Sequence, residues 1–106
     1  MNELIKNVKE WARERSLIKY ENRFKQFTKK IEETGEIAEA LAKDNQDLLE
    51  DAIGDDLVTS IILAEQCGLD IEKCLERAYN EIASRKGKTI DGVFVKEADL
   101  KNERTA

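Results

Sequence analysis

Apolar residues recur every three or four positions through most of the chain, which is the spacing of one face of an α-helix. This pattern predicts four helices, at about 3–15, 21–43, 47–67 and 71–86. The second half of the third helix is apolar nearly all round, which is typical of a helix in the middle of a bundle. Residues 89–97 instead hold β-branched side chains and an Asp-Gly turn signal, and they predict a short extended arm.

Composition favours a mostly helical domain. The 106 residues include no proline and only five glycines, and they are 41% apolar and 39% charged. This length is typical of one domain with one modest core, so we expect a single all-α domain over 1–106. Gly68 and Gly87 stand where the third and fourth helices should end.

The net charge of −5 argues against nucleic-acid or anionic-membrane binding, because both favour a basic surface. We see neither a signal peptide nor an apolar stretch long enough to span a membrane, and we expect a cytoplasmic protein. Cys67 and Cys74 lack a metal-binding spacing and predict free thiols. The absence of histidine excludes Ser-His-Asp and Cys-His catalysis. Catalysis must therefore use carboxylates, a metal, lysine or tyrosine.

Acidic side chains are concentrated in the second and third predicted helices. Residues 31–56 hold ten acids against one base, Lys43. An ordinary surface helix interleaves opposite charges to form pairs four residues apart, and this segment does not. Four of these acids are expected on plain surface: Glu39, Asp44, Asp47 and Glu50.

Five of the other six acids form pairs that share a helix face. Glu33 and Glu36 are three residues apart, and Glu32 and Glu36 are four apart. Asp51 and Asp55 are also four apart, and Asp55 continues an apolar stripe of the third helix. A buried carboxylate without a partner would protonate, so a metal or a distant basic group must compensate its charge.

A short connection should pack the second and third helices antiparallel, which brings both carboxylate pairs together. Four oxygen donors around one cavity suit Mg²⁺. The alternative is a solvated acidic face, helped by Lys29 and Lys30 one turn before Glu33. Gly35, inside a helix, indicates either close helix packing or room for a ligand, and spacing alone does not separate them.

Candidate substrate contacts lie outside the acidic segment. Arg85, Lys86 and Lys88 form a basic cluster that could hold phosphates or serve as favourable charge at a helix C-terminus. Trp11 is either a core residue or a platform for a base, and Asn80 lies on the polar face of the fourth helix.

Two motifs resemble a known family. Residues 32–40 (EETGEIAEA) resemble the EExGELaEA motif of MazG-like nucleoside triphosphate pyrophosphohydrolases. Residues 51–55 (DAIGD) resemble the family's second acidic motif, EExxD. The similarity covers about residues 8–97 and extends to small MazG-like proteins of phages, which implies a bacterial or phage-infected cell.

The resemblance implies an all-α fold with a four-helix bundle core completed in a homodimer or homotetramer. It implies Mg²⁺-dependent hydrolysis of an NTP or dNTP to the monophosphate and pyrophosphate, with Mn²⁺ as an alternative ion. By position, Glu33, Glu36 and Asp55 would be metal ligands, with Glu32 beside them. Ala52 stands where the family has Glu, so either Asp51 supplies the missing ligand or the site binds fewer metals.

The resulting hypothesis is a nucleoside triphosphate pyrophosphohydrolase in which Glu32 orients or deprotonates the attacking water. Phosphates would contact Arg85, Lys86 and Lys30, and the sugar or base would contact Asn80 or Trp11. The competing hypotheses are an inactive helical interaction module, favoured by Ala52, and a nucleotide sensor with slow turnover. The sequence does not determine base or sugar preference, the number of metal ions or the biological role.

Overall fold

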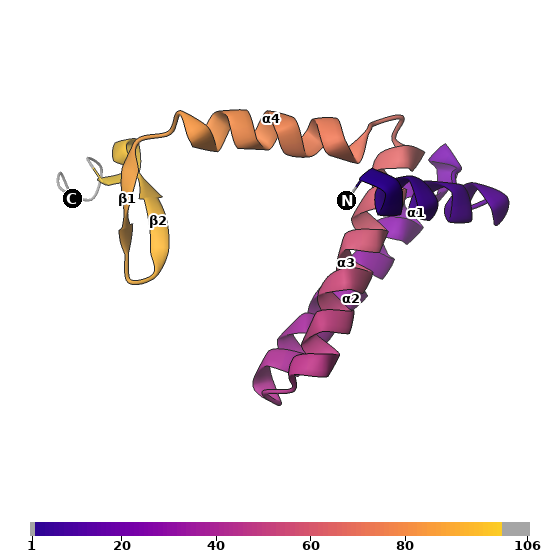
Figure 1. Cartoon of the computed structure of the whole chain (residues 1–106), viewed down its shortest axis with the longest axis horizontal. Helices are drawn as coiled ribbons and strands as arrows, with labels where there is room; N and C mark the ends of the chain where they lie inside the picture. Colours follow the sequence, from indigo (N-terminus) through magenta and orange to yellow (C-terminus); the bar gives the residue numbers. More distant parts are fainter. Residues whose placement is uncertain (1, 101–106) are drawn as a thin grey trace. The chain divides into compact units, whose positions relative to one another are not determined.

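A computed structural model describes residues 2–100 of the chain and shows an all-α protein with one small hairpin (Figure 1). The chain divides into two compact units between Lys73 and Cys74. The first unit contains α1 (Asn2–Glu14), the short 3-10 helix η1 (Tyr20–Asn22), α2 (Arg23–Ala42) and α3 (Gln46–Gln66). Helix α4 (Ile71–Ala83) begins in the first unit and continues into the second, which also holds β1 (Gly87–Ile90) and β2 (Val93–Lys96). The all-α class predicted from the sequence is confirmed, whereas the expectation of a single domain over 1–106 stays a prediction.

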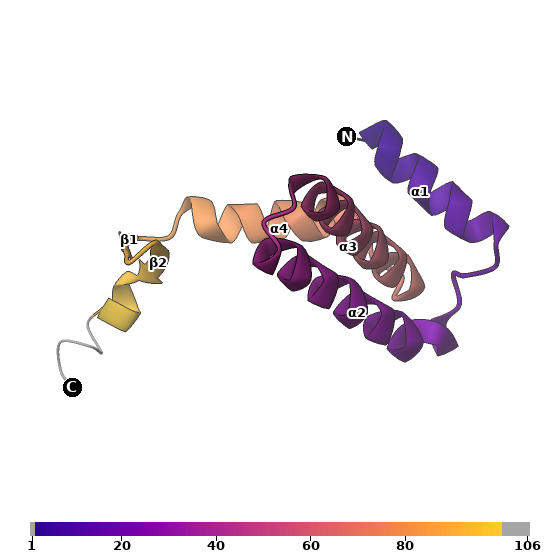
Figure 2. The same ribbon diagram turned by 90° about the horizontal axis from the view of Figure 1, so that it is seen from below.

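Helices α2 and α3 run side by side as an antiparallel pair (Figure 2). A short connection joins them, and Asn45 in this connection caps α3. The Asn45 side-chain oxygen accepts a hydrogen bond from the Leu48 backbone N–H at 3.0 Å. At the other end of α3 the chain turns at Gly68, where φ is +72°. The start of α4 is held by Asp70, whose carboxylate accepts from the Glu72 N–H at 3.2 Å.

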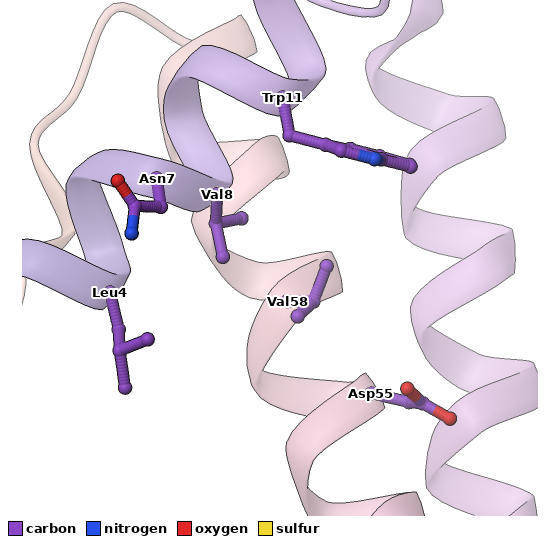
Figure 3. Close-up of a pocket in the computed structure, with 6 residues that line it drawn as sticks. All are labelled: Leu4, Asn7, Val8, Trp11, Asp55 and Val58. Carbon is purple, nitrogen blue, oxygen red and sulfur yellow. The ribbon is translucent and has the colours of Figure 1, made fainter.

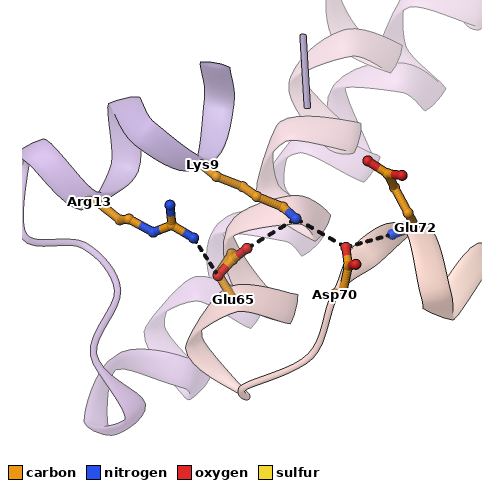
Figure 4. A network of polar contacts seen from close by, with 5 residues as sticks. All are labelled: Lys9, Arg13, Glu65, Asp70 and Glu72. Atoms are coloured by element: carbon orange, nitrogen blue, oxygen red, sulfur yellow. Dashed lines mark hydrogen bonds and ion pairs between the residues drawn. The ribbon is translucent and has the colours of Figure 1, made fainter. Parts of the chain in front are cut away.

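A network of ion pairs joins helix α1 to the C-terminal end of α3 and the residues that follow it (Figure 4). The Lys9 ammonium lies 3.3 Å from the Glu65 carboxylate and 3.0 Å from that of Asp70. Arg13 reaches Glu65 at 3.4 Å. Ala12, one residue before Arg13, is fully buried, so a small side chain allows α1 to approach closely.

The C-terminal segment differs from the predicted extended arm over 89–97. It is an antiparallel hairpin in which Gly87 pairs with Lys96 and Ile90 with Val93. Asp91 and Gly92 form its two-residue turn with φ values of +52° and +79°. Helix α4 ends at Ala83 rather than near residue 86.

The sequence pattern predicted that Gly87 ends the fourth helix, and this prediction is wrong. It begins strand β1, and a side chain there would collide with the backbone of Val95 on the facing strand. The close approach of the two strands explains the glycine.

The apolar stripe of α2 is exposed. Phe24 is 77% exposed, and Ile31 and Leu41 are also exposed, whereas the buried residues of this helix are Glu33 and Ala40. No large side chain among residues 2–100 is fully buried. The second half of α3, predicted to be central, supplies half of the buried residues among those that the structure describes: Thr59, Ile61, Ile62, Ala64 and Gln66.

Over the part of the chain that the structure describes, no helix has both the length and the apolar character needed to cross a membrane. Cys67 and Cys74 are free and exposed, as the sequence predicted.

Candidate metal centre

Three carboxylates from the paired helices meet near the middle of α2 and α3. Glu33 and Glu36 come from α2 and Asp55 from α3, and one oxygen of each lies within 4.8 Å of the others. The three-residue spacing on α2 places both glutamates on one face, and the antiparallel packing places Asp55 opposite them. We refer to these residues as the carboxylate cluster.

Glu33 is the most deeply placed member of the cluster, at 8% exposed. Its Oε2 atom is buried and has no hydrogen-bond partner, and its Oε1 atom lies 3.7 Å from the Lys29 ammonium. Burial raises the pKa of Glu33, and the neighbouring carboxylate of Glu36 raises it further, whereas Lys29 partly opposes the rise. An ionised Glu33 therefore needs a positive charge that the surrounding side chains supply only in part.

The negative charge of Asp55 is also compensated only in part by the surrounding side chains. Burial raises its pKa, as do the charges of Asp51 and Glu33, and Lys29 again opposes the rise. Carboxylate oxygens that are partly desolvated, close together and undercompensated are the donor set that a hard divalent cation prefers. The residues of the carboxylate cluster thus fit Mg²⁺.

The other residues predicted around the metal lie at the edge of the cluster. Asp51 is exposed and outside the three-carboxylate set, although its charge acts on Asp55. Glu32 is exposed and lies 3.8 Å from the Lys29 ammonium. Ala52, which replaces the family's Glu, is buried in the packed helices.

A cavity of about 480 Å³ opens beside the cluster, a size that suits a small organic ligand (Figure 3). We call it the apolar cavity. It lies between α1 and α3, and Asp55 forms one part of its wall. Trp11 lines it and is 46% exposed, so this tryptophan is a wall residue rather than a core residue. The lining residues are Leu4, Asn7, Val8, Trp11, Asp55 and Val58.

A second cavity, of about 400 Å³, shares Trp11, Asp55 and Val58 with the first and also reaches Glu33. We call it the acidic cavity. Lys29 is the one basic residue that lines it among those the structure describes. Sequence reasoning treated Lys29 only as a neutralising charge. Its spacing of four residues from Glu33 was the signal for a closer role.

Gly35 has open space around it, because a side chain there would meet nothing within 4 Å. Close packing within the described chain therefore does not explain this glycine. Of the two explanations left open by the sequence, room beside the helix is the one this structure favours.

The predicted phosphate and sugar contacts fall into two groups. Lys30 is paired with Asp56 at 2.8 Å and lines neither cavity. Asn80, Arg85 and Lys86 belong to the second unit, whereas the cluster belongs to the first. Their roles remain predictions.

The fold and the site define an all-α protein with an acidic centre suited to a divalent cation. Residues 28–90 match the MazG nucleotide pyrophosphohydrolase domain, and the chain belongs to this family, as the two acidic motifs predicted. The chain is also similar to an uncharacterized 18.2 kDa protein from the rep-hol intergenic region of Haemophilus phage HP1, with 41% identity over 70 residues. That alignment covers 66% of this chain and 43% of the phage protein, so the chain spans less than half of its relative. No solved structure matches the chain.

Proposed function

We propose that the protein hydrolyses a nucleoside triphosphate, either NTP or dNTP, to the monophosphate and pyrophosphate in a Mg²⁺-dependent reaction. The observation that carries the proposal is the carboxylate cluster, with its unpartnered Glu33 oxygen, in a chain of the nucleotide pyrophosphohydrolase family. The adjoining cavities offer space for the rest of the nucleotide.

In this proposal Glu33, Glu36 and Asp55 hold the metal, and Asp51 adds negative charge at the edge. Bound Mg²⁺ would neutralise phosphate charge and lower the pKa of water, which helps to activate water in a chain that has no histidine to act as a general base. Glu32, exposed next to Glu33, orients the water or accepts its proton. The water attacks the α-phosphorus, and pyrophosphate leaves.

The remaining substrate contacts follow from the same scheme. Trp11 contacts the base or sugar in the apolar cavity, where an aromatic face is available for stacking. Lys30, Arg85 and Lys86 are proposed to contact phosphates, and Asn80 is proposed to contact the sugar. We further propose that the protein acts as a homodimer or homotetramer in the cytoplasm of a bacterium or phage-infected cell. The exposed apolar stripe of α2 supports assembly.

The decisive experiment incubates the protein with a panel of NTPs and dNTPs, with and without Mg²⁺, and scores pyrophosphate separately from orthophosphate. We expect pyrophosphate only with Mg²⁺ (or with Mn²⁺ in its place). Glu36→Gln should lower the rate by about 100-fold or more, because it removes a metal ligand. Glu39→Gln is the matched control on the same helix, and it should retain the rate. Hydrolysis that survives a chelator would contradict the scheme.

The buried Ala52 favours a second candidate, a module that binds nucleotide or a protein partner without turnover. A nucleotide sensor would show a nucleotide-dependent rise in melting temperature with negligible phosphate release. An interaction module would show no Mg²⁺-dependent stabilisation at all.

A further inference from the structure

Two neighbouring lysines of α2 face different partners. Lys29 lies beside the carboxylate cluster and lines the acidic cavity, whereas Lys30 is bound to Asp56 at 2.8 Å. Consecutive positions on a helix point about 100° apart, so the two side chains cannot share one environment. Of the pair, Lys29 is the one placed to act on a ligand of the cluster.

The ion pairs of Lys29 are long. Its ammonium lies 3.7 Å from Glu33 and 3.8 Å from Glu32, beyond the range of about 2.7–2.9 Å for a charged hydrogen bond. By contrast, Lys43, the residue directly after α2, reaches Glu39 at 2.7 Å. The Lys29 side chain is 59% exposed, and a lysine stem is flexible. Lys29 therefore compensates charge without being fixed to one carboxylate.

The charge of Lys29 acts on both helices of the site. Its side chain lines the acidic cavity together with Glu33 of α2 and Asp55 of α3. A divalent cation among the same carboxylates would repel this ammonium and take over its role. The exposed, flexible side chain would then be free to reach a phosphate oxygen in the acidic cavity.

We propose that Lys29 is an exchangeable cation of this site. It compensates the carboxylate cluster before the metal binds, and it turns to a phosphate oxygen of the substrate once the metal is in place. This inference rests on the proposed function, because it requires the cluster to bind Mg²⁺.

The test measures binding by calorimetry on the full chain, with Mg²⁺ alone and then with inorganic pyrophosphate in excess Mg²⁺. Lys29→Met should bind Mg²⁺ roughly three to ten times more tightly, because a competing positive charge is removed. The same variant should bind pyrophosphate about tenfold more weakly, since a phosphate contact is lost. Lys29→Arg should retain pyrophosphate binding.

Lys43→Met is the matched control, since it also breaks a Glu–Lys pair four residues apart, at the end of α2, and it should change neither affinity. A purely structural role for Lys29 would weaken both affinities together rather than move them in opposite directions. Mg²⁺ binding by the unaltered protein with no gain in Lys29→Met overturns this inference alone. Failure of the unaltered protein to bind Mg²⁺ overturns the proposed function as well.

Discussion

The Glu33 carboxylate lies among packed helices with one oxygen unpartnered, so its ionised form destabilises the folded protein. Burial and Glu36 raise its pKa above the ordinary 4.5 in the folded protein. The folded state therefore binds the proton more tightly than the unfolded state does. The resulting destabilisation is absent below pH 4.5 and grows as the pH rises through the raised pKa.

We therefore expect Glu33→Gln to stabilise the metal-free protein at pH 7, raising its melting temperature by about 5 °C. The difference should disappear near pH 4, where both proteins are neutral at this position. Mg²⁺ should raise the melting temperature of the unaltered protein and leave that of Glu33→Gln unchanged. Thermal denaturation followed by circular dichroism, in chelator and in Mg²⁺, measures both effects.

Glu39→Gln serves as the control for this measurement. The pKa of Glu39 is lowered by Lys43, so its ionised form favours folding and its removal should not stabilise the protein. Equal melting temperatures for Glu33→Gln and the unaltered protein in chelator at pH 7 would contradict the interpretation of Glu33.

At the scale of elements, α1 closes the apolar cavity and depends on Lys9 for its attachment. The pKa of Lys9 is raised by Asp70 and Glu65, which shows that the charged form is stabilised in place, even though burial opposes it. Trp11 lies on the same helix and forms the cavity wall. Movement of α1 would therefore change the site as well as stability.

Lys9→Met should lower the melting temperature by about 5 °C and shift the fluorescence of Trp11, the only tryptophan, to longer wavelength. The reason is that Glu65 loses one of its two basic partners. Helix α1 then packs less firmly, and the Trp11 indole becomes more exposed to water. Lys6→Met, at an exposed position of the same helix, is the control. An unchanged emission maximum in Lys9→Met would show that the network does not hold Trp11.

At the scale of the whole molecule, large apolar side chains stay exposed on the paired helices. Ile31 on α2 and Ile53 and Leu57 on α3 are exposed, although each follows a helical apolar pattern that normally marks a buried face. Exposed stripes of this kind mark surfaces of association. Burial against a second copy would supply the core that the first unit lacks by itself.

We expect the protein to sediment at a multiple of its 12.1 kDa chain mass. Ile31→Glu should shift it toward the monomer, since a charge in an apolar interface is left without a partner. Leu69→Glu, a similar change at an exposed position after α3, should leave the assembly intact. Sedimentation equilibrium distinguishes these outcomes, and a monomeric unaltered protein would refute the proposed assembly.

The sequence by itself determined the helices, most of their ends and the acids that share a face. Periodicity, caps and the positive φ of Gly68 act within a few residues, so they can be read locally. The position of Asp55 on an apolar stripe also predicted its partial desolvation, and burial is the largest cause of the raised pKa of this side chain. Local patterns failed at Gly87, because the reason for that glycine is a strand that follows it in the chain.

Only the tertiary structure decided which side chains meet. It brought Asp55, and not Asp51, into the carboxylate cluster with Glu33. It also separated Lys29 from Lys30, whereas the sequence pattern gave a phosphate contact to Lys30 and not to Lys29. These contacts depend on which face of α2 packs against α3, and that orientation is set by packing between residues far apart in the sequence. A pattern along one helix does not contain this information, since the same stripe can face a partner helix, a cavity or solvent.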